Sequence, residues 1–301
     1  MKKKVTLRQL MEKGCVLAPC VFDCSSARAA ELSGFESIFL SGAELSMSMN
    51  GMPDLGVLNL EELLWATRRI AEVSPLPLAV DIEDGFGGPL SVFRTCDRMA
   101  KAGAMGVLLE DESEPGFARS VVADHLLPRE EYLAKIKAAV DALEGSDCLL
   151  MARTNMPLQD PKDFDEAIGR ASEAMNLGAD MVVINRVKDL ETAKRISERI
   201  PGWKGYPDLN QDGGLPPVRM EDIEPLNYRY VTMHYMLKAA MAGMLEYGDR
   251  HFKDKNNLYS LNQKPRGIGG QSAQPFFKPQ QWLDFEAQYT GKKIKFWGPS
   301  L

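Results

Sequence analysis

Eight short apolar runs of the kind that form β-strands alternate with helical segments along most of this chain. The expected strands are Val16–Phe22, Ser37–Ser41, Leu76–Asp81, Gly106–Glu110, Cys148–Arg153, Asp180–Asn185, Trp203–Leu209 and Arg229–Met233. The expected helices between them include Glu61–Glu72, Val92–Ala102, Arg129–Leu143, Asp163–Leu177 and Leu190–Arg199. Strands that alternate with helices predict a parallel sheet, and eight such units predict its closure into a (β/α)₈ barrel.

An open, doubly wound sheet is the alternative fold for the same alternation of elements. It has little support, because no Gly-x-Gly-x-x-Gly turn follows the first expected strand. The chain has 301 residues, of which 45% are hydrophobic, so it can bury a large core. That length suits two average domains or one barrel. We therefore predict an α/β protein of the TIM-barrel type.

The C-terminal part of the chain differs in composition from the rest. We expect residues 1–250 to form the barrel and residues 251–301 to form a loop and helix extension. The segment Asn256–Pro279 is rich in Asn, Gln, Gly, Pro and Ser and is predicted to be loop. A helix is expected over Gln280–Tyr289, and its aromatic face is expected to pack on the barrel or on a partner subunit. That face consists of Trp282, Phe285 and Tyr289.

Bulk composition excludes several classes of partner. The formal net charge is −6 and no basic stripe is present, which argues against nucleic acid. No apolar run is long enough to span a bilayer, and the N-terminus lacks the apolar core of a signal peptide. The five cysteines show no Cys-x-x-Cys spacing, so we expect buried thiols and not a metal pair. These features predict a soluble cytoplasmic protein.

Acidic residues crowd the C-terminal ends of two successive strands. Asp81, Glu83 and Asp84 follow the third strand, and Glu110 and Asp111 end the fourth. A single cluster of this kind could be a solvated acidic loop. Two clusters at neighbouring strand ends instead indicate one side of a metal site, because a divalent cation relieves the repulsion between the carboxylates. Their hard oxygen ligands favour Mg²⁺, with Mn²⁺ as an alternative.

Other polar residues also fall at strand ends, where the active site of a parallel barrel is located. Arg153 ends the fifth strand, and its guanidinium suits a substrate carboxylate or phosphoryl group. His234 lies in an apolar stretch and is expected to be a core histidine. The further candidates at strand ends and in the loops behind them are Ser41, Gly42, Ala43, Asp54, Asn185 and Asn210.

Together these motifs resemble the isocitrate lyase/phosphoenolpyruvate mutase superfamily, and within it the 2-methylisocitrate lyases. The resemblance covers about Leu7 to Tyr247. It rests on Phe22-Asp23, Ser25-Ser26-Ala27-Arg28, Ser41-Gly42-Ala43, Gly51-Met52-Pro53-Asp54, Asp81–Gly87, Leu109-Glu110-Asp111, Ala152-Arg153-Thr154 and Gly178-Ala179-Asp180. It implies a barrel whose last helix is exchanged between the subunits of a homodimer or homotetramer.

The resemblance also implies roles for individual residues. Mg²⁺ would be held by Asp81 and Glu83, with Glu110 and Asp54 reaching it directly or through water. An α-oxo or α-hydroxy carboxylate would bind that metal, the backbone of Ser41–Ala43 and Arg153. From their positions after strand ends, Asn185 and Asn210 are expected to complete the substrate site, and Arg153, Asp54 and Glu110 are the expected catalytic residues.

The chain departs from the family pattern at positions that decide the reaction. Lyases of this family carry a mobile loop with a catalytic cysteine, and here Ala118 stands at the cysteine and Ser120 at the following histidine. Asn185 replaces the Glu of the lyases and the His of the phosphonomutases. Glu83 stands where the second metal-binding acid is usually Asp, and Lys238 where an arginine is usual. The binding platform is retained, whereas the reaction-specific loop has changed.

Three functions remain open at this point. The first is a Mg²⁺-dependent lyase that breaks a carbon–carbon bond next to a carbonyl group, by decarboxylation of an oxaloacetate-like acid or by retro-aldol cleavage. The second is phosphorus–carbon chemistry of the phosphoenolpyruvate mutase or phosphonopyruvate hydrolase type. The third is a non-catalytic barrel that binds a 2-oxo acid. Decarboxylation is the lyase reaction least affected by Ala118, because it leaves an enolate without needing an acid to break the bond.

Overall fold

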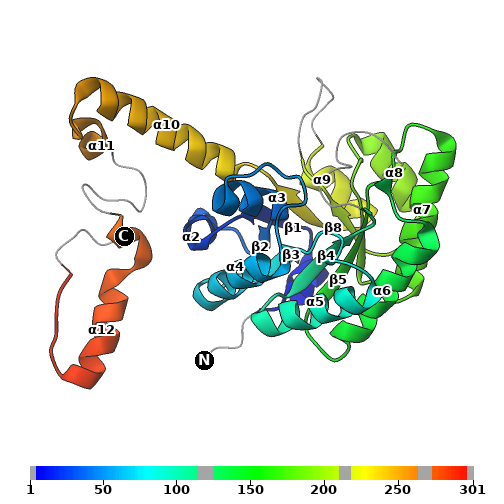
Figure 1. Cartoon of the computed structure of the whole chain (residues 1–301), viewed down its shortest axis with the longest axis horizontal. Coiled ribbons are helices and arrows are strands. Elements are labelled where there is room, and N and C mark those ends of the chain that lie inside the picture. Colours follow the sequence, from blue (N-terminus) through cyan, green and yellow to red (C-terminus); the bar gives the residue numbers. More distant parts are fainter. Residues whose placement is uncertain (1–4, 114–124, 210–217, 264–272, 297–301) are drawn as a thin grey trace. The chain divides into compact units, whose positions relative to one another are not determined.

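Eight parallel strands form a closed barrel in which each strand pairs with the next along the chain and β1 pairs with β8 (Figure 1). The strands are β1 (Val16–Val21), β2 (Ile38–Leu40), β3 (Leu78–Asp81), β4 (Gly106–Glu110), β5 (Leu149–Thr154), β6 (Met181–Ile184), β7 (Lys204–Tyr206) and β8 (Tyr228–Met233). The computed structural model describes residues 5–113, 125–209, 218–263 and 273–296. The predicted (β/α)₈ barrel is confirmed, and the open-sheet alternative is wrong.

Helices surround the barrel and connect its strands (Figure 1). The helices between the strands are α2 (Cys24–Ser33), α3 (Gly42–Leu45), α4 (Leu60–Val73), α5 (Pro89–Ala102), α6 (Arg129–Leu143), α7 (Pro161–Asn176), α8 (Leu190–Arg199) and α9 (Met220–Ile223). A π-helical turn, Ser46–Asn50, continues α3, and a 3₁₀ turn, Glu224–Leu226, continues α9. Helix α1 (Leu7–Lys13) precedes β1.

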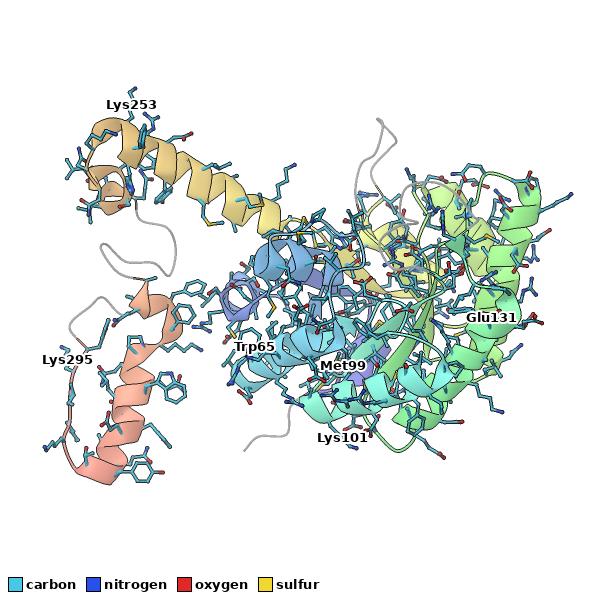
Figure 2. The ribbon with its side chains drawn as sticks, viewed as in Figure 1. Trp65, Met99, Lys101, Glu131, Lys253 and Lys295 are labelled. Atoms are coloured by element: carbon cyan, nitrogen blue, oxygen red, sulfur yellow. The ribbon has the colours of Figure 1, made fainter. Side chains whose placement is uncertain are left out.

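A side-chain cap begins helix α4, and an apolar face directs helix α5 towards the sheet. Asn59 caps α4 by accepting hydrogen bonds from the backbone N–H groups of Glu61 and Glu62, at 3.0 and 3.1 Å. On α5, Met99 is buried, whereas Lys101 is exposed on the surface (Figure 2). One apolar stripe per helix therefore fixes which face packs against the sheet.

The barrel has an inner and an outer apolar layer. The inner layer gathers alternate strand residues, among them Phe39, Leu108 and Tyr230, and Leu7 and Met11 of α1 pack with it. The outer layer joins the opposite faces of the strands to the surrounding helices. Because the interior is filled by side chains, the barrel has no open pore, and the polar residues are left to the strand ends.

The chain divides into two compact units, residues 1–237 and 238–301. The sequence-based boundary at residue 250 instead falls inside helix α10 (Met236–Asp254). The second unit also contains α11 (Leu258–Asn262), a 3₁₀ turn at Gln274–Phe277 and α12 (Pro279–Thr290). The segment predicted as loop, Asn256–Pro279, thus contains α11 and this turn, so that prediction is wrong in part; the expected last helix is present as α12.

Within the described residues, no helix is both long enough and apolar enough to cross a membrane. All five cysteines are free. Cys20, Cys96 and Cys148 are buried as expected, whereas Cys15 and Cys24 are half-buried.

Candidate active site

Three carboxylates converge at the C-terminal edge of the barrel. Asp81 is the last residue of β3, Glu83 follows two residues later, and Glu110 is the last residue of β4. One carboxylate oxygen from each of them lies within 4.8 Å of the other two. All three side chains are buried. The pairing of β3 with β4 therefore brings together the acids that the sequence separates by almost thirty positions.

The backbone after β3 turns sharply to place Glu83. This residue adopts a positive φ of 53°, which is uncommon for a side chain other than glycine. Its N–H donates a hydrogen bond to Asp81 Oδ1 at 3.1 Å, which helps to hold the turn. Its carboxylate fills the space beside Gly42, where an added Cβ would lie 1.9 Å from Glu83 Oε1. Glycine at position 42 thus makes room for the longer acid at position 83.

Burial strongly disfavours the ionised form of these acids. It raises the pKa of Asp81 above its ordinary value, and burial with repulsion from Asp81 and Glu110 raises the pKa of Glu83 well above its ordinary value. Burial is also the main cause that raises the pKa of Glu110 to about 8. A divalent cation would relieve both the burial of charge and the repulsion. The three buried oxygen donors therefore fit a hard cation such as Mg²⁺.

Arg153 joins this cluster from β5. Its Nη1 forms an ion pair with Glu110 Oε1 at 2.8 Å, and its Nε donates to Asn155 Oδ1 at 3.0 Å. Burial by itself would lower the pKa of Arg153, but the charges of Glu110 and Asp81 raise it. Asn155 in turn donates from Nδ2 to Glu110 Oε2 at 2.7 Å and to Glu112 Oε1 at 2.9 Å. Arginine and amide together fix the orientation of the Glu110 carboxylate.

Asp111 has a different position from its neighbour Glu110. It accepts hydrogen bonds from Thr154 Oγ1 at 2.5 Å and from the N–H of Asn155 at 2.9 Å, and Arg170 Nη1 lies 3.2 Å away. It lies outside the three-carboxylate cluster found among the described residues. Asp111 therefore anchors the end of β5 and holds Asn155 in place.

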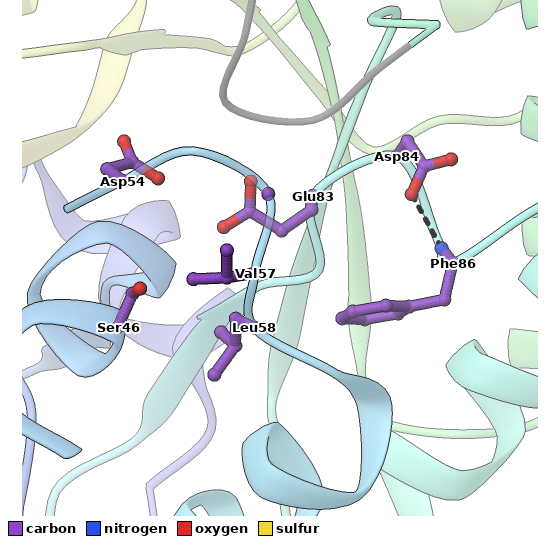
Figure 3. A pocket seen from close by; sticks show the side chains of 8 residues that line it. Ser46, Asp54, Val57, Leu58, Glu83, Asp84 and Phe86 are labelled. Atoms are coloured by element: carbon purple, nitrogen blue, oxygen red, sulfur yellow. Dashed lines mark hydrogen bonds between the residues drawn. The ribbon is translucent and has the colours of Figure 1, made fainter. Parts of the chain in front are cut away.

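Two cavities lie beside the carboxylates. The larger, of about 390 Å³, is lined by Asp81 and Arg153 together with residues from the ends of other strands. The smaller, of about 260 Å³, is lined by Asp54, Glu83 and Asp84 (Figure 3). The larger cavity has the size and the mixed charges for a small anionic substrate next to a metal site.

The family model described as phosphoenolpyruvate phosphomutase matches residues 7–242. The chain belongs to the phosphoenolpyruvate mutase/isocitrate lyase superfamily. Enzymes of this superfamily cleave carbon–carbon and phosphorus–carbon bonds in small carboxylates. The cluster of Asp81, Glu83 and Glu110 is consistent with the magnesium site of the superfamily.

Individual superfamily members are also similar to this chain. The 2,3-dimethylmalate lyase of Eubacterium barkeri is 32% identical over 76% of this chain and 78% of its own length. The oxaloacetate decarboxylase of Pseudomonas putida strain GB-1 is 33% identical over 70% of this chain and 74% of its own length. A solved structure of oxaloacetate acetylhydrolase with the inhibitor 3,3-difluorooxalacetate superimposes with a TM-score of 0.84 at 27% identity, covering 96% and 97% of the two chains.

The structure brings together many, but not all, of the site residues predicted from the sequence. Ser41, Ala43 and Asn185 line the larger cavity, and Gly42 packs against Glu83. Asp54 lines the smaller cavity and is not among the clustered acids. Three residues named in the sequence analysis lie outside the described residues: Ala118, Ser120 and Asn210.

The prediction that His234 is a core histidine is wrong. Its side chain is 41% exposed, and the residue lines the larger cavity. The physical reason is that β8 ends at Met233, so His234 lies where the chain leaves the sheet at its C-terminal edge. Its apolar neighbours in sequence belong to β8 and α10, not to a common buried face. Position at a strand end was the signal that could have identified it.

Proposed function

We propose that this protein is a Mg²⁺-dependent lyase that breaks a carbon–carbon bond next to the carbonyl group of a small 2-oxo or 2-hydroxy carboxylic acid. Decarboxylation of an oxaloacetate-like acid is the reaction we favour. The observation that carries the proposal is the joint presence of three buried carboxylates and Arg153 in and beside one cavity. The names of the similar lyase and decarboxylase support it.

The cation would be held by Asp81, Glu83 and Glu110. When bound, it would act as a Lewis acid that polarises the substrate carbonyl. Arg153 would bind a substrate carboxylate, and its charge lowers the pKa of Glu110 against the larger effect of burial. Asn155 would keep Glu110 in the orientation that the pairing requires. Breaking the bond to carbon dioxide then needs no acid from the loop that carries Ala118.

Phosphorus–carbon chemistry is the second candidate. It is favoured by the matching family model and by two further cations of the larger cavity, Arg186 and Lys188, which suit a phosphoryl group. Decarboxylation remains the first choice because the similar enzymes include one named oxaloacetate decarboxylase.

The five free cysteines support a reducing, cytoplasmic location for either activity.

A substrate panel tests the proposal. Purified protein with Mg²⁺ is supplied with oxaloacetate, 2,3-dimethylmalate, 2-methylisocitrate or phosphonopyruvate, and pyruvate, oxalate and phosphate are measured. We expect pyruvate from oxaloacetate above the level that Mg²⁺ alone produces. Release of oxalate from oxaloacetate would support carbon–carbon cleavage, but by hydrolysis and not by decarboxylation. Phosphate from phosphonopyruvate alone would support the second candidate, and Mg²⁺-dependent binding without turnover would support a non-catalytic barrel.

A further inference from the structure

Two acids that are neighbours in the sequence each pair with an arginine of their own. Glu110 ends β4 and Asp111 follows it, and both side chains are buried. Arg153 Nη1 lies 2.8 Å from Glu110 Oε1, and Arg170 Nη1 lies 3.2 Å from Asp111 Oδ2. Arg153 lines the larger cavity, whereas Arg170 belongs to the outer helix α7. One ion pair therefore lies at the cavity and the other lies behind it.

The Arg170 side chain is held in place from the outer side of the barrel. It is buried, and its Nε donates to Glu166 Oε1 at 2.9 Å, one turn earlier on α7. Glu166 in turn forms an ion pair with Arg129 of α6. Among the ion pairs of the described residues, Arg170 is the one cation joined to Asp111. Arg170 is therefore the group that compensates the buried charge of Asp111.

The two ion pairs are close enough to act on each other. Burial raises the pKa of Asp111, and the charges of Arg170 and Arg153 are among the causes that lower it. Tyr132 lies near both pairs, because the charges of all four residues affect the pKa of its hydroxyl, which burial raises well above its ordinary value. The same hydroxyl donates to the backbone oxygen of Arg153 at 3.0 Å. A change of charge at Asp111 is therefore felt by the guanidinium that faces the cavity.

We propose that Arg170 is a positioning residue for substrate binding: it neutralises Asp111, so that Arg153 remains available to a substrate carboxylate. This inference rests on the proposed function, in which Arg153 binds that carboxylate. Without Arg170, the buried charge of Asp111 would attract Arg153 and would repel an anion in the cavity. Arg170 is not among the described residues that line either cavity, so it acts on the substrate through Asp111.

The uncompensated charge would have the opposite effect on a cation. A carboxylate without its arginine, directly behind Glu110, would add to the negative potential at the cluster of Asp81, Glu83 and Glu110. Loss of Arg170 should therefore weaken the binding of an anion without weakening the binding of Mg²⁺. A general loosening of the site would instead weaken the binding of both.

Titration calorimetry measures the two affinities separately. Mg²⁺ alone is titrated first, and oxalate, which carries two carboxylates, is then titrated into protein saturated with Mg²⁺. The variants are Arg170→Met, Asp111→Asn and the double variant with both changes. Asparagine at position 111 keeps an oxygen for the N–H of Asn155, and its amide can donate to the Thr154 hydroxyl. The double variant therefore removes both charges and keeps the hydrogen bonds at the end of β5.

Arg199→Met is the matched control. Arg199 on α8 pairs with Asp165 on α7 at 3.1 Å, and the two side chains are 51% and 66% exposed. This variant also removes the arginine of an Arg–Asp pair, but at the surface and not behind the cavity. Circular dichroism spectra establish that each variant is folded.

We expect Arg170→Met to weaken oxalate binding by about 10–100-fold, the usual effect of losing a group that orients a binding residue. Its Mg²⁺ affinity should be equal to that of the unmodified protein or tighter. Adding Asp111→Asn should return oxalate affinity to near that of the unmodified protein, and Arg199→Met should change neither affinity.

Unchanged oxalate affinity in Arg170→Met would overturn the inference and leave the proposed function intact. So would a loss of both affinities, or a double variant that binds oxalate as weakly as Arg170→Met. If the unmodified protein with Mg²⁺ neither binds oxalate nor releases pyruvate from oxaloacetate, the proposed function and this inference both fail. Should Arg170→Met not fold, Arg170→Gln decides: its amide can still donate to Asp111 and lacks only the charge, so unchanged oxalate affinity in it contradicts the inference.

Discussion

Glu83 Oε1 lies where a side chain on Gly42 would have to go, 1.9 Å from the Cβ position of that residue. The loop after β2 and the turn after β3 therefore fit together only because position 42 has no side chain. Resemblance to the superfamily places a shorter acid, Asp, at position 83. The length of the acid and the absence of a side chain at Gly42 are thus linked in this protein.

Gly42→Ala should weaken Mg²⁺ binding by at least about tenfold, because the new Cβ would displace the Glu83 carboxylate from Asp81 and Glu110. Adding Glu83→Asp in the same protein should restore part of the affinity, since the shorter side chain leaves room for the methyl group. Titration calorimetry with Mg²⁺ or Mn²⁺ measures both. Gly243→Ala is the matched control, because an added Cβ there meets no atom within 4 Å. Unchanged affinity in Gly42→Ala would show that Glu83 is not a ligand.

Glu44→Gln should change how stability depends on pH. Burial raises the pKa of Glu44 from 4.5 to about 7 in the folded protein, so the folded state holds a proton that the unfolded chain releases. The stability that this bound proton contributes is fully present below the pKa of 4.5 that the group has in the unfolded chain. It is lost as the pH rises through about 7, and the loss reaches about 3 kcal/mol. Because glutamine does not ionise, the Glu44→Gln protein does not lose this stability as the pH rises. Urea unfolding at pH 5 and pH 8 should therefore favour Glu44→Gln over the unmodified protein more at pH 8, and equal differences at both pH values would contradict the burial of this acid.

The aromatic face of α12 should mediate self-association. Trp282, Phe285 and Tyr289 are 69%, 51% and 77% exposed, which is unusual for three large side chains on one helix. We expect a homodimer or homotetramer at micromolar concentration by light scattering. The double variant Trp282→Glu, Phe285→Glu should shift the mass towards the monomer, whereas Gln281→Glu, on an exposed polar position of the same helix, should not. A monomeric mass for the unmodified protein would rule out the interface.

Ala118 should prevent efficient methylisocitrate cleavage. A placed proton donor contributes about 10²–10⁴-fold, and alanine supplies none at the position of the lyase cysteine. We expect negligible release of pyruvate from 2-methylisocitrate by the unmodified protein, and no gain in oxaloacetate decarboxylation from Ala118→Cys. Robust methylisocitrate cleavage without the thiol would contradict the preference for decarboxylation.

The fold could be predicted from local patterns. The bounds expected for β4, α6 and α8 agree with those observed, because local signals precede each of them: Gly103 ends the helix before β4, Pro128 precedes α6, and Asp189 caps α8. Strand β7 is shorter than predicted and ends at Tyr206, just before Pro207, which has no N–H to donate to a ladder. Strand β2 also ends early, since Ser41 becomes the N-cap of α3. Local chemistry at the ends therefore explains these differences.

The site could be predicted only in part. Its acids follow strands that are neighbours in sequence, so the positions of Asp81 and Glu110 were enough to place them together. The proximity of Glu44 to His234 has no such signal. It depends on the closure of the barrel, in which β1 pairs with both β2 and β8, although the two residues are about 190 positions apart. For this reason the sequence pattern alone placed His234, a polar residue in an apolar stretch, in the core.

The most direct test of the central claim is Mg²⁺-dependent pyruvate release from oxaloacetate by the unmodified protein and by Asp81→Asn. Asparagine keeps an oxygen that can accept the hydrogen bond from the Glu83 N–H, so the turn after β3 should survive while the metal-binding charge is lost. We predict release well above that of Mg²⁺ alone for the unmodified protein, and release equal to Mg²⁺ alone for Asp81→Asn. Equal release by both proteins, or none by either on any 2-oxo acid, would contradict a metal-dependent lyase at this site.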